Sequence, residues 1–129
     1  MKGLRKDGSA VRVMTVDDSP VIRKLIKKAL EPEGFAIIGE AGNGRDAVEL
    51  CFKLNPDIIT MDITMPIMDG LEAALAIKEK NPRQKIIMLS AMSDQDIVAD
   101  AMSRGINHFC SKPFKAEDMI AKILQVINE

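Results

Sequence analysis

Short apolar runs alternate with longer amphipathic stretches along almost the whole chain. The runs are rich in β-branched residues and too short for helices, so they predict strands at residues 11–16, 35–40, 57–61, 85–90 and 107–110. The stretches between them place apolar residues three or four positions apart, which predicts helices at residues 20–33, 43–55, 70–80, 94–104 and 115–128.

Capping residues support these boundaries. The pair Ser19–Pro20 combines a preferred N-cap residue with a residue that suits the first helical position. Asn43 and Asp69 stand in the same way before the second and third helices. Gly34 and Gly105 follow the first and fourth helices, where glycine commonly ends a helix. The predicted helices therefore have defined starts and ends.

The alternation predicts an α/β domain of the (βα)5 type, with one five-stranded parallel sheet and five helices on both of its faces. Parallel neighbours need a crossover connection, and helices supply it while they cover the sheet. Residues 57–61 and 85–89 are nearly continuous apolar runs, as expected of central strands buried on both faces. The length of 129 residues suits one domain, so we expect residues 11–129 to form it after a flexible, polar lead-in of residues 1–10.

The overall charge gives no support to two classes of partner. Basic residues number 18 and acidic residues 19, a balance that offers no electrostatic case for nucleic acid or a membrane surface. No apolar run approaches the roughly 18 residues of a membrane span, and residues 1–10 lack the apolar core of a signal peptide, so we expect a cytoplasmic protein. Cys51 and Cys110 have no metal-ligand spacing, and we expect two reduced, buried thiols without a chemical role.

Polar residues of three kinds follow the predicted strands. Asp17 and Asp18 come after the first strand, Asp62 after the third, Ser90 at the end of the fourth and Lys112 after the fifth. Ligands of open α/β sheets bind at the carboxyl ends of the strands, and these ends lie along one edge of a parallel sheet. We therefore expect three acids, one hydroxyl and one base to converge there.

Such a cluster of carboxylates predicts a cation and a phosphoryl group. Three carboxylates close together repel one another unless protons or a cation neutralise them. Oxygen ligands without a neighbouring His or Cys favour Mg²⁺, with Mn²⁺ as an alternative, and Mg²⁺ commonly shares its coordination with phosphate oxygens. Lys112 and Ser90 are then expected to hold phosphoryl oxygens, and one of the Asp residues to act as the nucleophile.

Each of these residues taken alone has an ordinary explanation. An Asp at a strand end is commonly a helix cap or a turn residue. A lysine is usually solvated, and a serine hydroxyl usually has a local hydrogen-bond partner. Their joint placement at one edge of the sheet is what favours a functional site over these explanations.

Four short motifs occur in a fixed order along the chain. They are VDDSP at residues 16–20, MDITMPIMDG at 61–70, MLSAM at 88–92 and KPF at 112–114. Over residues 11–128 the chain resembles the response-regulator receiver domain, and in particular its stand-alone, chemotaxis-type members. The resemblance implies a doubly wound, flavodoxin-like fold and a role in two-component signalling.

The resemblance also implies a role for each acid. Asp62 would accept a phosphoryl group from the phosphohistidine of a histidine kinase, or from a small donor such as acetyl phosphate. Asp18 would bind Mg²⁺ directly and Asp17 mostly through water, while Asp62 and the backbone carbonyl of Thr64 would complete the protein ligands. No other cofactor is expected.

The remaining motif residues would bind the phosphoryl group and transmit its presence. By the resemblance, Ser90 and Lys112 would hold the phosphoryl oxygens, and the Lys112–Pro113 bond would be cis. Phe109 would be the switch aromatic that turns inward when Ser90 is drawn toward the phosphoryl group. The family more often has Tyr and Thr at the positions of Phe109 and Ser90, and both differences are common variants. Met92 and Thr64 match the variable positions that tune dephosphorylation.

The implied output surface is the face of the fourth helix, fifth strand and fifth helix. Phe109 and Lys115 would belong to it, and Val98 either joins them or packs in the core. His108 beside Phe109 is interpreted as an exposed bystander. Because no further domain follows the last predicted helix, we expect the chain to signal to a protein partner. We also expect a monomer.

Two other functions stay open from the sequence. One is a phosphohydrolase of the haloacid-dehalogenase type, whose pattern requires a second acid two residues after the nucleophile, where this chain has Thr64. The other is a receiver that belongs to a longer DNA-binding regulator or hybrid kinase. For the receiver we expect no turnover of an external substrate, so the chain would not be an enzyme in the usual sense.

Overall fold

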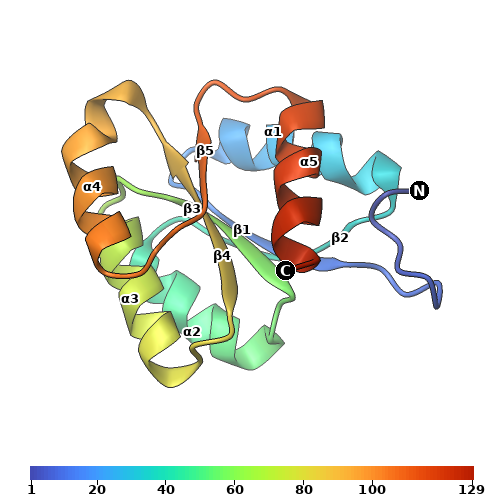
Figure 1. Ribbon diagram of the computed structural model, residues 1–129, viewed down its shortest axis with the longest axis horizontal. Helices are drawn as coiled ribbons and strands as arrows, with labels where there is room; N and C mark the ends of the chain where they lie inside the picture. The colour runs from blue at the N-terminus through green and yellow to red at the C-terminus, as the bar shows by residue number, and fades with distance from the viewer.

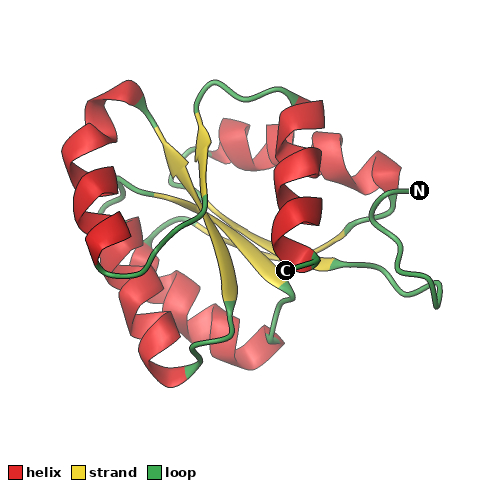
Figure 2. Cartoon of the chain, viewed as in Figure 1, coloured by secondary structure: helices red, strands yellow, loops and turns green.

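A five-stranded sheet lies between two layers of helices in the computed structural model, which describes residues 1–129 (Figures 1 and 2). The strands are β1 (Arg12–Val16), β2 (Ala36–Ala41), β3 (Ile58–Asp62), β4 (Lys85–Ser90) and β5 (Phe109–Ser111). The helices are α1 (Pro20–Leu30), α2 (Gly44–Leu54), α3 (Gly70–Lys80), α4 (Gln95–Ser103) and α5 (Ala116–Ile127).

All strand pairs are parallel, and their order across the sheet is β2-β1-β3-β4-β5. Helices α1 and α5 cover one face of the sheet, whereas α2, α3 and α4 cover the other (Figure 1). This is the predicted doubly wound fold. None of the helices combines the length and apolar composition that a membrane crossing requires.

Adjacent residues of the central strands enter opposite cores. Met61 of β3 and Met88 of β4 pack against α2 and α3, while Ile58 and Leu89 of the same strands pack against α1 and α5. Side chains alternate across a strand, so a strand covered by helices on both faces is apolar at nearly every position. The continuous apolar runs of the sequence are explained by this double burial.

The predicted helix caps are confirmed by hydrogen bonds. The Ser19 hydroxyl accepts from the amide of Ile22 at 3.3 Å, and Asn43 Oδ1 accepts from the amide of Asp46 at 2.9 Å. Asp69 Oδ1 accepts from the backbone amide three residues ahead at 2.8 Å. Each cap satisfies an amide that the first helical turn would otherwise leave without a partner.

Most predicted boundaries lie within one residue of the observed ones, and the clearest differences have a structural reason. The first helix ends at Leu30 and continues as a 3-10 turn, Glu31–Glu33, because Pro32 cannot donate to the helical ladder. A 3-10 turn also precedes α4, at Met92–Asp94. The last strand was predicted at residues 107–110 but lies at Phe109–Ser111, because only these residues pair with the end of β4.

The two cysteines are free and do not have the same burial. Cys51 is buried, as predicted, but Cys110 is only half-buried. The prediction of a second buried thiol was wrong because β5 is the edge strand of the sheet. Burial raises the pKa of both thiols above the usual value.

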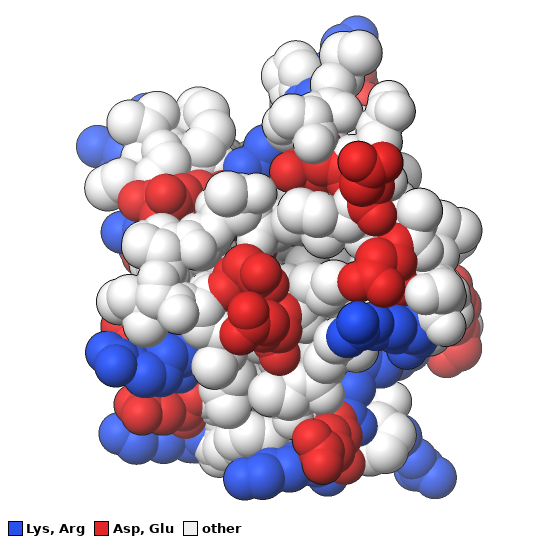
Figure 3. All heavy atoms as spheres, turned by 90° about the vertical axis from the view of Figure 1, so that its left-hand side faces the viewer, with Lys and Arg blue, Asp and Glu red and all other residues white.

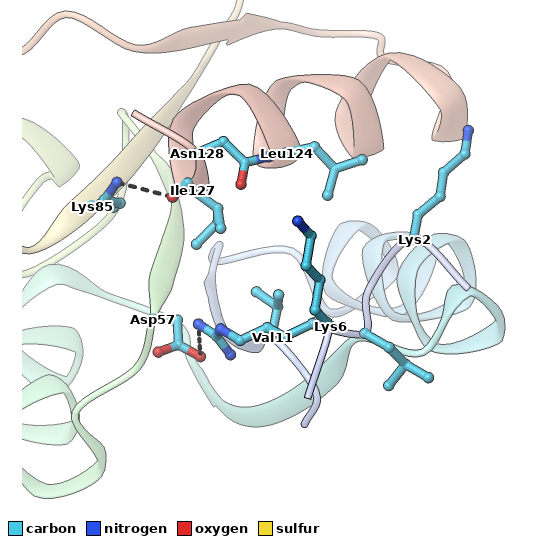
Figure 4. A pocket seen from close by; sticks show the side chains of 10 residues that line it. Lys2, Lys6, Val11, Asp57, Lys85, Leu124, Ile127 and Asn128 are labelled. Atoms are coloured by element: carbon cyan, nitrogen blue, oxygen red, sulfur yellow. Dashed lines mark hydrogen bonds and ion pairs between the residues drawn. The ribbon is translucent and has the colours of Figure 1, made fainter. Parts of the chain in front are cut away.

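Residues 1–10, predicted as a flexible lead-in, contact the domain at several points. The amide of Gly3 donates to the carbonyl of Glu33 at 2.7 Å, and Arg5 forms an ion pair with Asp57 at 3.1 Å (Figure 4). Gly3 and Arg5 therefore each have a partner in the domain. The flexibility of the segment stays a prediction.

A hollow of about 540 Å³ lies between this segment and the end of α5 (Figure 4). Beside it, Lys85 Nζ donates to the carbonyls of Val126 and Ile127 at 2.7 and 3.3 Å, which satisfies the last turn of α5. Val11 and Asp57 also line the hollow, and both precede strands. It therefore lies at the end of the sheet opposite to the carboxyl ends of the strands.

Gly70, the first residue of α3, lies against the end of β3, and a Cβ there would collide with the backbone carbonyl of Asp62. We expect Gly70→Ala to lower the free energy of unfolding by about 3 kcal/mol, because backbone must move. Gly105→Ala is the matched control: Gly105 has φ +91° but open space around it, so only backbone strain of about 1 kcal/mol is expected. Equal losses in chemical denaturation would contradict this account of Gly70.

Candidate functional site

The predicted acids, hydroxyl and base lie along one edge of the sheet. Val16 at the end of β1 pairs with Met61 of β3, so the residues that follow each of them, Asp17 and Asp62, are neighbours. On the other side of β3, Asp62 pairs with Leu89 of β4, next to Ser90. The strand register thus brings the positions of Asp17, Asp62 and Ser90 together at one edge of the sheet.

Three carboxylates form the centre of the site. Ligand atoms of Asp17, Asp18 and Asp62 all lie within 4.8 Å of one another. Asp17 is 1% exposed and Asp62 7% exposed, whereas Asp18 is open to solvent. A set of oxygen donors with one open side and no His or Cys fits a hard divalent cation that keeps part of its water.

Lys112 joins two of the carboxylates. Its Nζ donates to Asp62 Oδ1 at 2.9 Å and to Asp17 Oδ2 at 3.1 Å. The backbone holds it in place, because the Lys112 amide donates to the carbonyl of Ser90 at 2.7 Å. The Lys112–Pro113 bond is cis, as expected.

The site shifts the pKa of both partners of its ion pair. Burial raises the pKa of Asp62, and the charges of Asp17 and Asp18 add to this effect, while the hydrogen bond from Lys112 opposes it. For Lys112, burial favours the neutral amine, but the bonds to Asp62 and Asp17 outweigh it and hold the pKa above its usual value. Lys112 is therefore a permanent cation at neutral pH, and Asp62 carries a charge that the fold disfavours.

Space for a further group adjoins this cluster. A hollow of about 250 Å³ is lined by Ser90, Met92, Val98 and Lys112, among other residues. Ser90 is 9% exposed and its hydroxyl forms no hydrogen bond with another protein group. It is free to serve a new acceptor.

The residues of the predicted output face differ in exposure. Phe109 and Val98 are both half-buried and pack against the core beneath α2, α3 and α4. Lys115 is exposed. His108, interpreted from the sequence as an exposed bystander, is half-buried, and its Nε2 lies 3.1 Å from Glu129 Oε1. That interpretation was wrong about exposure, because the ring contacts the side chain of Glu129.

Charges on the side of the molecule that carries α4 are mixed. Figure 3 shows small acidic and basic groups separated by uncharged atoms, with no broad basic surface on this side. On α4 the exposed acids are Asp96 and Asp100, and the latter pairs with Arg104 at 3.2 Å. This face offers no match for a polyanion.

Two residues near the site were not predicted. Arg23 of α1 donates to the backbone carbonyl of Asp17 and, at 3.1 Å, to Glu40. Asp94, expected only as the start of a helix, is 6% exposed and contacts two loops. Asp94 stands three residues after Ala91, the spacing of a capping box, so the sequence could have indicated its bond to the Ala91 amide. The contacts of Arg23 could not be predicted in this way, because they depend on the tertiary structure.

Comparison with known proteins decides the family. The response regulator receiver domain matches residues 13–124. The chain belongs to this family. As a CheY-like receiver of two-component signalling, it is 43% identical to the chemotaxis protein CheY of Bacillus subtilis, over 92% of this chain and 99% of that one. It is 42% identical to the CheY of Thermotoga maritima, over 89% and 96%.

Solved structures agree with the fold of this receiver. A CheX–CheY–BeF3–Mg²⁺ complex from Borrelia burgdorferi contains a chain that is 34% identical, with a TM-score of 0.90, over 97% of this receiver and 96% of that chain. The response regulator domain of Thermotoga maritima CheB is 33% identical, with a TM-score of 0.84, over 94% and 98%. The sheet order and helix layers are thus those of a CheY-like receiver.

The receiver's buried charge leads to a prediction about stability. The pKa of Asp62 is higher in the folded protein than in the unfolded chain. Asp62 therefore contributes most to the free energy of unfolding below the pKa of an unfolded Asp, and this contribution is lost as the pH rises through the pKa of Asp62 in the folded protein. With a chelator present at about pH 7, we expect Asp62→Asn to raise the free energy of unfolding, because the amide removes a buried negative charge. Lys112 keeps Asp17 as a partner in this variant.

Urea denaturation at about pH 7 and about pH 4 measures this effect, and the difference between variant and wild type is expected to shrink at the lower pH. The matched control is Asp96→Asn on the exposed side of α4, where we expect a change below about 0.5 kcal/mol. A variant at Asp62 that is less stable than wild type at neutral pH would refute the assignment of a destabilising charge.

Proposed function

We propose that Asp62 accepts a phosphoryl group from the phosphohistidine of a histidine kinase and that the phosphorylated receiver signals to a protein partner. One observation carries this proposal: Asp62 lies beside two further carboxylates, with Lys112 Nζ 2.9 Å from its Oδ1. Its Oδ2 receives no hydrogen bond from the protein and is not sealed from solvent. An oxygen in that position is available as a nucleophile.

The chemistry requires no separate base. The Asp62 carboxylate attacks phosphorus, the bond between phosphorus and the histidine nitrogen of the kinase breaks, and that nitrogen keeps the electron pair. A carboxylate is already a nucleophile at neutral pH. Lys112, a permanent cation held between Asp17 and Asp62, stabilises the charge on the transferring oxygens. The free hydroxyl of Ser90 donates to another of these oxygens.

The acids fit a metal that assists this transfer. We propose that Asp18, Asp17, Asp62 and the backbone carbonyl of Thr64 hold Mg²⁺, or Mn²⁺ in its place. The donors at hand are oxygens, and Asp18 is open to solvent on the side where a hydrated ion would enter. A bound Mg²⁺ supplies positive charge for the carboxylates and the phosphoryl oxygens.

Signal output is proposed to pass through Ser90 and Phe109 to the face of α4, β5 and α5. A hydroxyl drawn toward the phosphoryl group moves the turn after β4, and the hollow beside Ser90 and Val98 gives side chains room to rearrange. Phosphorylation then biases two arrangements of one face, because its charge is bound better in one of them. Val98 and Lys115 would contact the partner.

We propose that residues 11–129 form the receiver and act as a monomeric, chemotaxis-type regulator in the cytoplasm, without nucleic acid as a ligand. Nearly complete coverage of the CheY relatives supports this size. A receiver has no external substrate, so sustained turnover of phosphate esters would favour a phosphohydrolase instead. The full reading frame separates a stand-alone regulator from one module of a longer regulator or kinase.

Intact-mass spectrometry with acetyl phosphate tests the acceptor. With Mg²⁺ present, we expect one phosphoryl adduct on the wild-type chain and on Asp96→Asn, which removes an exposed acid of α4. Asp62→Asn lacks the nucleophile and is expected to form no adduct, and a chelator should suppress the adduct on wild type by at least about tenfold. An adduct that survives both Asp62→Asn and the chelator would place the modification elsewhere.

A further inference from the structure

Asp94 is a buried acid that forms no ion pair. It is 6% exposed at the end of the 3-10 turn Met92–Asp94, and no Lys or Arg lies within 4.0 Å of its carboxylate. Burial of a charge without a cation is costly unless hydrogen bonds satisfy it. The start of α4 supplies part of the compensation, because the positive end of a helix dipole stabilises an acid. Its carboxylate also accepts two hydrogen bonds.

These bonds lead to two different loops. Asp94 Oδ2 accepts from the amide of Ala91 at 2.8 Å, in the turn that follows Ser90. Asp94 Oδ1 accepts from the hydroxyl of Thr64 at 3.3 Å, thirty positions earlier in the chain. The first bond closes the 3-10 turn Met92–Asp94, and a residue that only capped this turn would not need the second. The second bond ties the loop after β3 to the loop after β4.

We infer that Asp94 is a positioning residue that joins the metal-binding loop of Thr64 to the switch loop of Ser90. The inference rests on the proposed function of the site. Thr64 is exposed, so the bond to Asp94 is the side-chain contact that anchors it. An anchored Thr64 presents its backbone carbonyl in a fixed direction, and a fixed ligand binds a cation more tightly than a mobile one.

The two hydrogen bonds of Asp94 also couple movements of the two loops. Phosphorylation draws Ser90 toward Asp62, and the amide of Ala91 moves with it. Since that amide is bonded to Asp94, and Asp94 to Thr64, the loop beside the metal and the start of α4 respond together. The path runs through Thr64, Asp94 and Ala91, whose side chains lie outside the acid cluster.

Mg²⁺ titration of ¹⁵N-labelled protein by NMR tests the bridge through metal binding rather than phosphorylation. We expect Thr64→Val, which keeps the shape of the side chain and removes its donor, to weaken Mg²⁺ binding about fivefold. The 3.3 Å bond is long, so a larger loss is not expected. Thr64→Ser keeps the donor and should restore most of the affinity.

Asp94→Ala and the double variant complete the comparison. If the two side chains act through one bond, Asp94→Ala weakens Mg²⁺ binding, and adding Thr64→Val to it causes no further loss. A cap alone would lower stability and leave Mg²⁺ affinity unchanged. Because Asp94→Ala removes a buried group, the exposed Thr64→Val keeps the test decisive if Asp94→Ala does not fold.

Unchanged affinity in Thr64→Val, or additive losses in the double variant, would overturn the bridge. In that case wild type still binds Mg²⁺ and still forms the adduct on Asp62, so the proposed function stands. Wild type that does not bind Mg²⁺ near Asp17, Asp18 and Asp62 would instead overturn the proposed metal site, and the bridge with it.

Discussion

Repulsion among three carboxylates is the constraint on which this structure depends. Asp17 and Asp62 are buried at adjacent strand ends with Asp18 beside them, and the nearby cation of the protein is Lys112. One lysine offsets only part of three negative charges, and burial, together with the charges of Asp17 and Asp18, raises the pKa of Asp62. Such a cluster can bind a second cation, and with it a phosphoryl group.

The fold holds this unfavourable cluster in place with apolar packing. β3 is buried along its whole length between two cores, so Asp62 cannot retreat toward solvent without disturbing both. The start of α3 also holds the end of β3, since the Gly70 amide donates to the carbonyl of Ile63 at 2.6 Å. The apolar packing of the sheet thus offsets the cost of holding three carboxylates together. Functional sites commonly carry such a local cost, which the rest of the fold offsets.

Much of this could be predicted from residues alone. Apolar runs and caps gave the strand and helix order, and the rule that parallel strands end at one edge brought Asp17, Asp18, Asp62, Ser90 and Lys112 together. Local pattern could not give the start of β5, since a three-residue edge strand is defined by its pairing with β4. It also could not give the contacts of Arg23 and Asp94, which depend on side chains that reach between elements distant in sequence.

A crystal structure with beryllium fluoride and Mg²⁺ would test whether Asp62 is the phosphoryl acceptor, because beryllium fluoride stands in for a phosphoryl group on a carboxylate. We expect beryllium bonded to an oxygen of Asp62 and Mg²⁺ bound by Asp17, Asp18, Asp62 and the Thr64 carbonyl. Lys112 and Ser90 are expected to contact fluorine atoms. Beryllium fluoride bonded to Asp17 or Asp18 would contradict the assignment of Asp62 as the acceptor. So would a structure in which Lys112 still pairs with the acids and neither beryllium fluoride nor Mg²⁺ is bound.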